Sequence, residues 1–351
     1  MTKPLAAAPP SALDDTLAAP FARIDDAALG LLAATGWGLE VESVRRLSTE
    51  RDDSVLVTHS RGRHVLKIAH PADNPALLDF QCSALQHATD RDPGLPLPRL
   101  LPDVEGAVLR TVTGATGEPR LARALGYLDG AILDYATTTK PQREAVGVAA
   151  GRLSLALCDF EHAASHRRLA WDLQQVATLR PLLVHVPDLD ARPLVEAELD
   201  AYDDHVGVAL RATRQQVVHQ DVNADNLVVD ASAPGFVTGI LDFGDAVHSS
   251  VVGDLAVAMS YALAGRDDDD PWAAAFDVAR GFVSARELTA DETALLPSLV
   301  RTRLAQRLLL NSWLAATDPS NAPYTGRSIA RTALALRRLV ATPSPLERQG
   351  A

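Results

Sequence analysis

Cysteine is scarce in this chain of 351 residues, which holds only Cys82 and Cys158. The two thiols lie far apart without C-x-x-C spacing, which argues against a disulfide framework and against a zinc site. Long apolar runs are also missing, because none reaches the ~18 residues that a membrane span needs. The N-terminus does not place basic residues before an apolar stretch, as a secretory signal would. We therefore expect a cytoplasmic protein that does not enter a membrane.

Basic charge is the second shortage, since 33 Lys and Arg face 45 Asp and Glu, giving a formal net charge of −12. Nucleic acids and anionic membranes attract basic surfaces, so neither is expected as a partner. An acidic protein would attract a cationic or zwitterionic small molecule, although the same acidity also serves solubility alone. The length exceeds that of a typical domain, which predicts two packed lobes.

The order of the predicted elements divides the chain. Residues 1–21 are rich in Ala and Pro and predict a disordered extension. Residues 22–128 predict a small lobe with a helix near 24–34, three strands (VESVRRLS, DSVLVTHS and RHVLKIA), a helix over 74–88 and a further strand in GAVLRTVT. Residues 129–351 show long helical patterns, interrupted by VVHQD, NLVVD and FVTGILDFG. This order predicts an α+β, bilobal fold whose second lobe is mostly helical.

Two polar clusters that follow apolar strands carry the chemistry. VVHQDVNADN contains His219, Asp221 and Asn226, and Asp242 follows directly in ILDFG. This is the phosphoryl-transfer pattern H-x-D-x-x-x-x-N followed by D-F-G. Asp221 would accept the proton of an attacking hydroxyl, Asn226 and Asp242 would bind Mg²⁺, and His219 would be a buried orienting residue. The alternative makes Asp221 and Asn226 turn residues and Asp242 a cap at the end of a strand.

The first lobe should supply a lysine that holds the α- and β-phosphates of a nucleotide. Lys67 stands in the third predicted strand, and Lys3 and Lys140 are the other lysines of the chain. A solvated strand lysine is the alternative. Gln81 stands where a glutamate would pair with this lysine, so it would offer a hydrogen bond without charge.

No glycine-rich loop covers the expected phosphate site. The turn LSTERDDS takes its place between the first two strands. It offers the hydroxyls of Ser48 and Ser54 as candidate phosphate donors.

These motifs resemble the aminoglycoside phosphotransferase and choline kinase-like superfamily over roughly residues 22–340. Within it, the chain is most similar to hydroxylysine kinases and to the phosphotransferase domains related to class III aminotransferase fusions. The similar strings are LSTERDDSVLV, VLKIAH, DFQCSALQH, FEHAASHRRLAWDL, VVHQDVNADNLVV, GILDFGDAVHSSVVGDLAVAMSYAL and RTRLAQRLLLNSWLAATDP. The resemblance implies a protein-kinase-like fold, ATP or GTP with Mg²⁺, and a small amino-bearing molecule whose hydroxyl receives the phosphate.

Carried over by residue, the resemblance makes Asp221 the base, Asn226 and Asp242 the metal ligands and Lys67 the phosphate contact. It also implies that Asp254, in VVGDLA, braces the catalytic loop, with a role as a helix N-cap as the alternative.

Two features depart from the pattern. Gln220 stands where the family often has glycine. GDAVHSSVVGDLA passes straight into a predicted helix without a long activation loop, which favours a small acceptor over a protein.

The acceptor pocket is less defined by sequence. Asp245 is the best candidate to meet an ammonium group, and Arg303 and Asn311 are candidates for a carboxylate, with a salt bridge within the core helix as the alternative. Three functions remain open: a kinase for an amino-acid-like alcohol, an antibiotic or homoserine-type kinase, and a nucleotide-binding pseudokinase scaffold. The sequence leaves the oligomeric state open.

Overall fold

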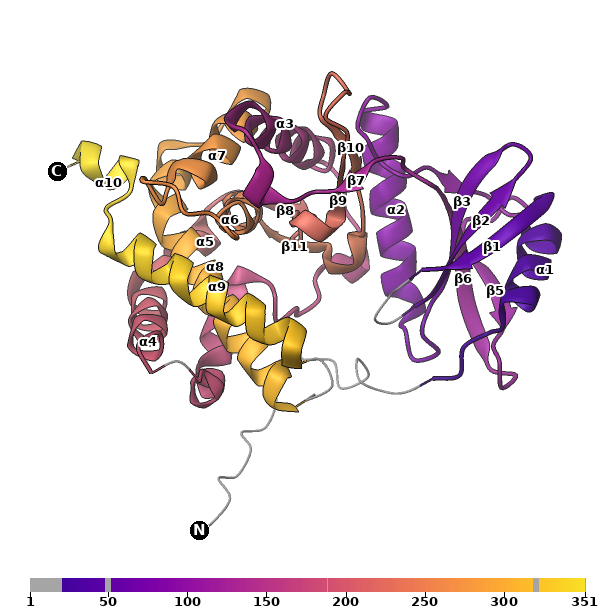
Figure 1. The fold of residues 1–351 in the computed structure, drawn as a ribbon, viewed down its shortest axis with the longest axis horizontal. Helices are drawn as coiled ribbons and strands as arrows, with labels where there is room; N and C mark the ends of the chain where they lie inside the picture. The colour runs from indigo at the N-terminus through magenta and orange to yellow at the C-terminus, as the bar shows by residue number, and fades with distance from the viewer. Residues whose placement is uncertain (1–20, 48–51, 188, 318–321, 351) are drawn as a thin grey trace, which may run out of the picture.

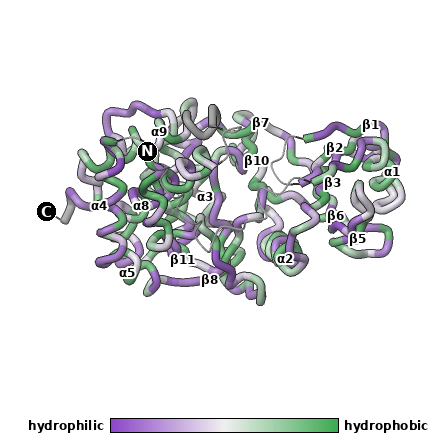
Figure 2. The backbone as a smooth tube through the Cα atoms, turned by 90° about the horizontal axis from the view of Figure 1, so that it is seen from below, coloured by the Kyte–Doolittle hydropathy of each residue, from purple (hydrophilic) through white to green (hydrophobic). Residues whose placement is uncertain are grey.

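The computed structural model describes residues 21–47, 52–187, 189–317 and 322–350 (Figure 1). An antiparallel sheet with two helices forms one end of the molecule, and the remaining helices form the other end, as both ribbon and tube views show (Figures 1 and 2). The predicted disordered extension lies, except for Phe21, outside the described residues. Within the described ranges, no helix combines the length and apolar character of a membrane span.

The six-stranded sheet has the order β1-β2-β3-β6-β4, with β5 also paired to β6. Its strands are β1 (Val41–Arg46), β2 (Asp53–His59), β3 (Gly62–Ile68), β4 (Leu100–Leu101), β5 (Arg110–Thr113) and β6 (Pro119–Gly126). The three strands predicted first are confirmed. β6 was not predicted, because PRLARALG contains two arginines and two alanines, which are poor strand signals.

Two helices accompany this sheet. α1 (Asp26–Trp37) begins at Asp25, whose side chain accepts a hydrogen bond from Ala28 N, and ends at Gly38 with φ 62°. Glycine suits that left-handed position. α2 (Pro75–Arg91) begins at Asn74 with Pro75 at its first position, and it lies between the sheet and the helical end (Figure 1).

The helical end is built around α6 (Val251–Tyr261), in which each residue from Val251 to Ser260 is buried. A π-helical turn, Tyr202–Val206, separates α4 (Arg192–Ala201) from α5 (Gly207–Ala212). The other helices are α3 (Lys140–Ala156), α7 (Ala273–Ala285), α8 (Ala290–Thr317), α9 (Ala322–Ala341) and α10 (Pro345–Gly350).

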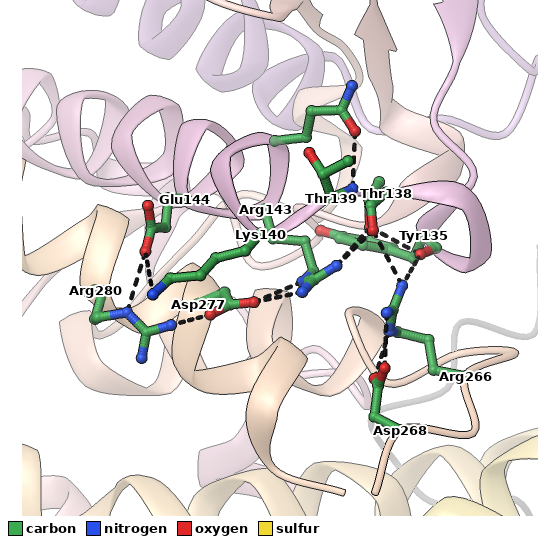
Figure 3. A network of polar contacts seen from close by, with 11 residues as sticks. Tyr135, Thr138, Thr139, Lys140, Arg143, Glu144, Arg266, Asp268, Asp277 and Arg280 are labelled. Atoms are coloured by element: carbon green, nitrogen blue, oxygen red, sulfur yellow. Dashed lines mark hydrogen bonds and ion pairs between the residues drawn. The ribbon is translucent and has the colours of Figure 1, made fainter. Parts of the chain in front are cut away.

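Helices α3 and α7 approach closely through glycine. A Cβ atom on Gly281 of α7 would lie 1.9 Å from the carbonyl oxygen of Glu144 on α3. Beside this contact, Asp277 accepts hydrogen bonds from Arg143 Nε at 2.8 Å and also pairs with Arg280 (Figure 3). The buried ion pair and the glycine contact together fix how the two helices cross.

Two small sheets lie between the sheet end and the helices. One has the order β10 (Val237–Ile240), β9 (Leu227–Val229), β7 (Ala131–Ile132), and the other pairs β11 (Val247–Ser250) with β8 (Gln215–Val218). The predicted strands VVHQD, NLVVD and FVTGILDFG correspond to β8, β9 and β10. As predicted, GDAVHSSVVGDLA leads into a helix without a long loop, since α6 begins at Val251 directly after the short strand β11. The lobe boundary near residue 128 stays a prediction.

Candidate active site

The loop from β8 to β9 is fastened from within by His219, whose side chain is fully buried. Its Nδ1 accepts a hydrogen bond from Asp221 N at 3.3 Å, so its Nε2 donates to the carbonyl oxygen of Leu241 at 3.0 Å. His219 therefore ties the loop that carries Asp221 to the end of β10, which carries Asp242. His219 is buried as predicted, and its orienting role stays a prediction.

Asp254 holds the same loop from α6. Its buried carboxylate accepts a hydrogen bond from Gln220 N at 2.7 Å, and burial raises the pKa of this carboxyl. The N-cap of α6 is Ser250, which accepts from Gly253 N, so the alternative of Asp254 as the N-cap is wrong.

Gln220 adopts the backbone conformation that glycine would favour, with φ 68°. Its Nε2 donates to the carbonyl oxygen of Trp171 at 3.1 Å, whereas its Oε1 is buried without a hydrogen-bond partner among the described residues. A non-glycine residue in this region costs on the order of 1 kcal/mol or more. The backbone at Gln220 is therefore strained, and the hydrogen bonds of Gln220 to Asp254 and Trp171 hold it in this conformation.

Two asparagine side chains donate hydrogen bonds to the Asp221 carboxylate. Oδ1 accepts from Asn223 Nδ2 and Oδ2 accepts from Asn226 Nδ2, both at 2.7 Å. Because Asn226 uses its amide nitrogen on Asp221, its oxygen is left to face another partner. Burial raises the pKa of Asp221. Asn223, and not Asp221 or Asn226, caps the turn at 224–226.

Asp242 begins the next turn, 243–245, with φ 61°. Its Oδ1 accepts from Gly244 N at 2.8 Å, so the alternative of a cap at the end of a strand holds for one oxygen. The other oxygen, Oδ2, lies 3.7 Å from Lys67 Nζ, and the side chain is 47% exposed toward the space beside the sheet. The Lys67 ammonium is the main reason that the pKa of Asp242 is lowered.

Lys67 does not pair with Gln81, the partner predicted from the sequence. Its Nζ lies 3.3 Å from Asp52 Oδ2, whereas Gln81 Oε1 accepts a hydrogen bond from Arg123 Nη2 at 3.4 Å. The cleft between the sheet, α2 and the Asp242 turn is lined by Lys67, Gln81, Cys82, Leu85, Pro98, Leu100, Arg123, Leu125, Asp242 and Phe243. Four polar side chains therefore share this cleft with a lining that is otherwise largely apolar.

Of the two serines predicted to bind phosphate, only Ser54 lies among the described residues. Ser54 stands directly across from Lys67 in the β2–β3 pair, and its Oγ is buried without a hydrogen-bond partner among the described residues. Ser48 lies outside the described residues.

Asp245 lies close enough to Asp221 for the two carboxylates to interact electrostatically. Burial, with the nearby Asp221 carboxylate as the next cause, raises the pKa of Asp245 to about 7. Arg167 holds the turn next to it by donating to the carbonyl oxygens of Gly244 and Ala246.

The two candidates on α8 are separated. Arg303 is buried and donates to the carbonyl oxygen of Trp171 and to Gln306 Oε1, with its guanidinium 5.2 Å from the Trp171 ring centre. Within the described ranges it forms no ion pair, so the salt-bridge alternative is not what the helix contains. Asn311 instead contacts Ser328 of α9 at 3.4 Å.

Four residues of this site were missed by sequence reasoning: Asp52, Arg123, Arg167 and Asn223. Asn223 lies inside the recognised motif and could have been found there. Arg123 lies on β6, a strand that was not predicted because of its composition. The residues around Arg123 come from distant parts of the chain.

Residues 43–292 match the model of the phosphotransferase enzyme family. The chain belongs to this family. Hydroxylysine kinase of Mus musculus is 26% identical over 322 residues, which cover 85% of each chain. Homoserine kinase of Polaromonas naphthalenivorans is 28% identical over 67% of this chain and 71% of its own.

The fold of this phosphotransferase is similar to that of amicoumacin kinase hAmiN in complex with AMP-PNP, Ca²⁺ and Ami. The TM-score is 0.69 at 17% identity, over 94% of this chain and 98% of that one. The predicted superfamily and bilobal kinase-like fold are confirmed, as is the prediction of a small-molecule kinase.

Proposed function

We propose that this phosphotransferase moves the γ-phosphate of ATP or GTP, with Mg²⁺, to the hydroxyl of a small amino-bearing acceptor, with hydroxylysine as the first candidate. The observation that carries the proposal is the Asp221 carboxylate, held by two amides at 2.7 Å next to the turn of Asp242. The named relatives, hydroxylysine kinase and homoserine kinase, support an amino-acid alcohol.

Asp221 is the proposed general base. With both carboxylate oxygens held by amide nitrogens, the side chain cannot rotate away from an incoming hydroxyl. Burial raises its pKa, which makes it a better proton acceptor than a solvated carboxylate. Phosphoryl transfer otherwise demands positioning and charge neutralisation, and Lys67 supplies a positive charge to the donor phosphates.

Asn226 and Asp242 fit Mg²⁺ by their chemistry. Both offer hard oxygen atoms, and Mg²⁺ binds to one or two protein carboxylates or amides together with substrate phosphates. The described residues contain no group of three or more His, Cys, Asp or Glu that would hold a metal. A metal held by Asn226 and Asp242 would therefore share its other positions with phosphate and water, and would neutralise phosphate charge.

Asp245 is the proposed contact for the acceptor's ammonium group. Its pKa of about 7 in the absence of a cation reflects burial and its proximity to Asp221, and an ammonium group would favour its ionised form. Arg303 and Asn311 remain weaker candidates for a carboxylate, because Arg303 already binds to Trp171 and Gln306 and Asn311 faces α9.

An acceptor screen tests the proposal. Purified protein with Mg²⁺ and either ATP or GTP is offered 5-hydroxylysine, homoserine, choline, ethanolamine and an aminoglycoside, and the phosphorylated product is detected by mass. We expect turnover of an amino-bearing alcohol, reduced at least ~10²-fold in Asp221→Ala.

Two results would contradict the proposal. Full turnover in Asp221→Ala would remove the assigned base. Nucleotide binding without phosphorylation of any acceptor would favour the pseudokinase scaffold instead.

A further inference from the structure

Three polar side chains form a row across the sheet. Ser54 on β2 pairs directly with Lys67 on β3, and Lys67 pairs directly with Arg123 on β6. Residues that stand opposite one another in neighbouring strands project from the same face. Lys67 and Arg123 both line the cleft beside α2, so the row faces the space proposed for the donor nucleotide.

One carboxylate oxygen lies within ion-pair distance of both cations of this row. Asp52 Oδ2 lies 3.3 Å from Lys67 Nζ and 4.0 Å from Arg123 Nη2. Arg123 is buried, with 8% of its surface exposed, and it donates a hydrogen bond to the neutral Gln81 of α2. At the edge of the row, the buried Ser54 Oγ has no hydrogen-bond partner among the described residues. The row thus combines two cations and an unused hydroxyl, which is the chemistry that phosphate oxygens require.

Asp52 lies next to the first paired residue of β2 and outside the hydrogen-bonded ladder of the sheet. The β2–β3 pairing begins at Asp53 opposite Ile68. Asp53 is anchored by a buried ion pair with Arg120 at 2.8 Å, which fixes the start of the strand. A change in Asp52 therefore leaves β2 in place.

We infer that Arg123, together with Lys67 and Ser54, is a second phosphate-binding cation for the donor nucleotide, and that Asp52 occupies this cradle until the nucleotide displaces it. The inference rests on the proposed function, because it assumes a nucleoside triphosphate donor. Phosphate oxygens would replace Asp52 as the acceptors of both cations. The Asp52 carboxylate would then be repelled by them and would turn outward.

Binding measurements separate this role from a structural one. Calorimetric titrations use AMP-PNP with Mg²⁺ and adenosine, with GMP-PNP and guanosine in parallel. Arg123→Gln should weaken triphosphate-analogue binding at least about tenfold, because it removes a charge-assisted hydrogen bond, while nucleoside binding stays within about twofold. Arg123→Lys should fall between wild type and Arg123→Gln.

Asp52→Asn should act in the opposite direction. It removes the competing carboxylate charge, so AMP-PNP binding should tighten about threefold or more while adenosine binding is unchanged. In the double variant with Arg123→Gln this gain should shrink, because one of the two cations that Asp52 occupies is gone. Arg61→Gln is the matched control, since it removes one positive charge from the exposed β2–β3 turn and should change neither affinity.

Several results would overturn the inference. Equal weakening of AMP-PNP and adenosine in Arg123→Gln, with a lower unfolding temperature, would make Arg123 a residue of the fold. Weaker AMP-PNP binding in Asp52→Asn would make Asp52 a support for Lys67. Unchanged binding in Arg123→Gln, in a protein that still phosphorylates an acceptor, would defeat the cradle alone, whereas absence of any nucleotide binding in wild type would defeat the donor proposal as well.

Discussion

Replacing Asp254 with asparagine tests how the catalytic loop is held. The side chain keeps its shape, but the 2.7 Å hydrogen bond from Gln220 N then ends on a neutral oxygen. The carboxylate also accepts a hydrogen bond from His219 N, whereas asparagine has a single accepting oxygen, so one buried N–H loses its partner at a cost on the order of 1–2 kcal/mol. The loop also contains Gln220 at φ 68°, whose strain favours release once the restraint weakens.

This difference predicts a measurable loss of both stability and turnover. The free energy of unfolding in urea should fall by about 1–2 kcal/mol. Because a small displacement of a catalytic group can lower the rate about 10²-fold, kcat should fall between about tenfold and 10²-fold. The KM for the nucleotide should change less than about threefold, since Lys67 lies on the sheet and not on this loop.

The control is Asp291→Asn, which neutralises an exposed carboxylate in the first turn of α8 and should change stability by no more than about 0.5 kcal/mol. Wild-type kcat in Asp254→Asn would refute the reasoning, because the loop would then keep its geometry without the charged brace. A loss of stability with unchanged kcat would assign Asp254 to the fold alone.

Three further predictions concern single residues. The folded pKa of Asp245, about 7, lies above its ordinary value of 3.8, so its contribution to stability is fully present below the latter and is lost progressively as the pH rises from there to about 7. Asp245→Asn should therefore be more stable than wild type in urea unfolding at pH 8.5, by about 1 kcal/mol more than at pH 6, and a pH-independent difference would refute this. Gly281→Ala should cost about 1–3 kcal/mol and lower the melting temperature, because the new Cβ would meet Glu144 O at 1.9 Å; an unchanged value would mean that α3 and α7 separate freely. Gln220→Gly relieves the positive φ but loses the bond to Trp171 O, so kcat should stay within about fivefold, and a 10²-fold loss would make that bond necessary for activity.

The sequence was sufficient for the elements with strong local signals. Strands β1 to β3 and helix α2 follow alternation and capping residues, and the loop with Asp221 and Asn226 is contiguous in the chain. Pairings over long sequence distances were not predictable. Arg123 contacts Gln81 and Asp52 because β6 pairs with β3 in the sheet. The local sequence around Gln81 does not indicate that its side chain binds to Arg123 and not to Lys67.

The conformation of Gln220 was also beyond sequence reasoning. A glutamine at φ 68° is strained in isolation and persists because Asp254 and Trp171 hold it from distant segments. The sequence around Arg303 likewise predicts only an arginine on a core helix. Its contact with the Trp171 ring depends on the folding of distant segments against each other.

The short strand β7 has a consequence for how such an enzyme can evolve. It leads from the large sheet into the helices, and it is itself hydrogen-bonded to β9, the strand that begins directly after Asn226. Gly130, just before β7, leaves no room for a side chain, since a Cβ there would lie 2.6 Å from Val229 O. The connection between the large sheet and the helices is therefore in direct backbone contact with the strand that follows Asn226. A side chain at Gly130 would push against β9 and shift Asn226, so new acceptors are more readily gained by changing the side chains that line the cleft than by changing this connection.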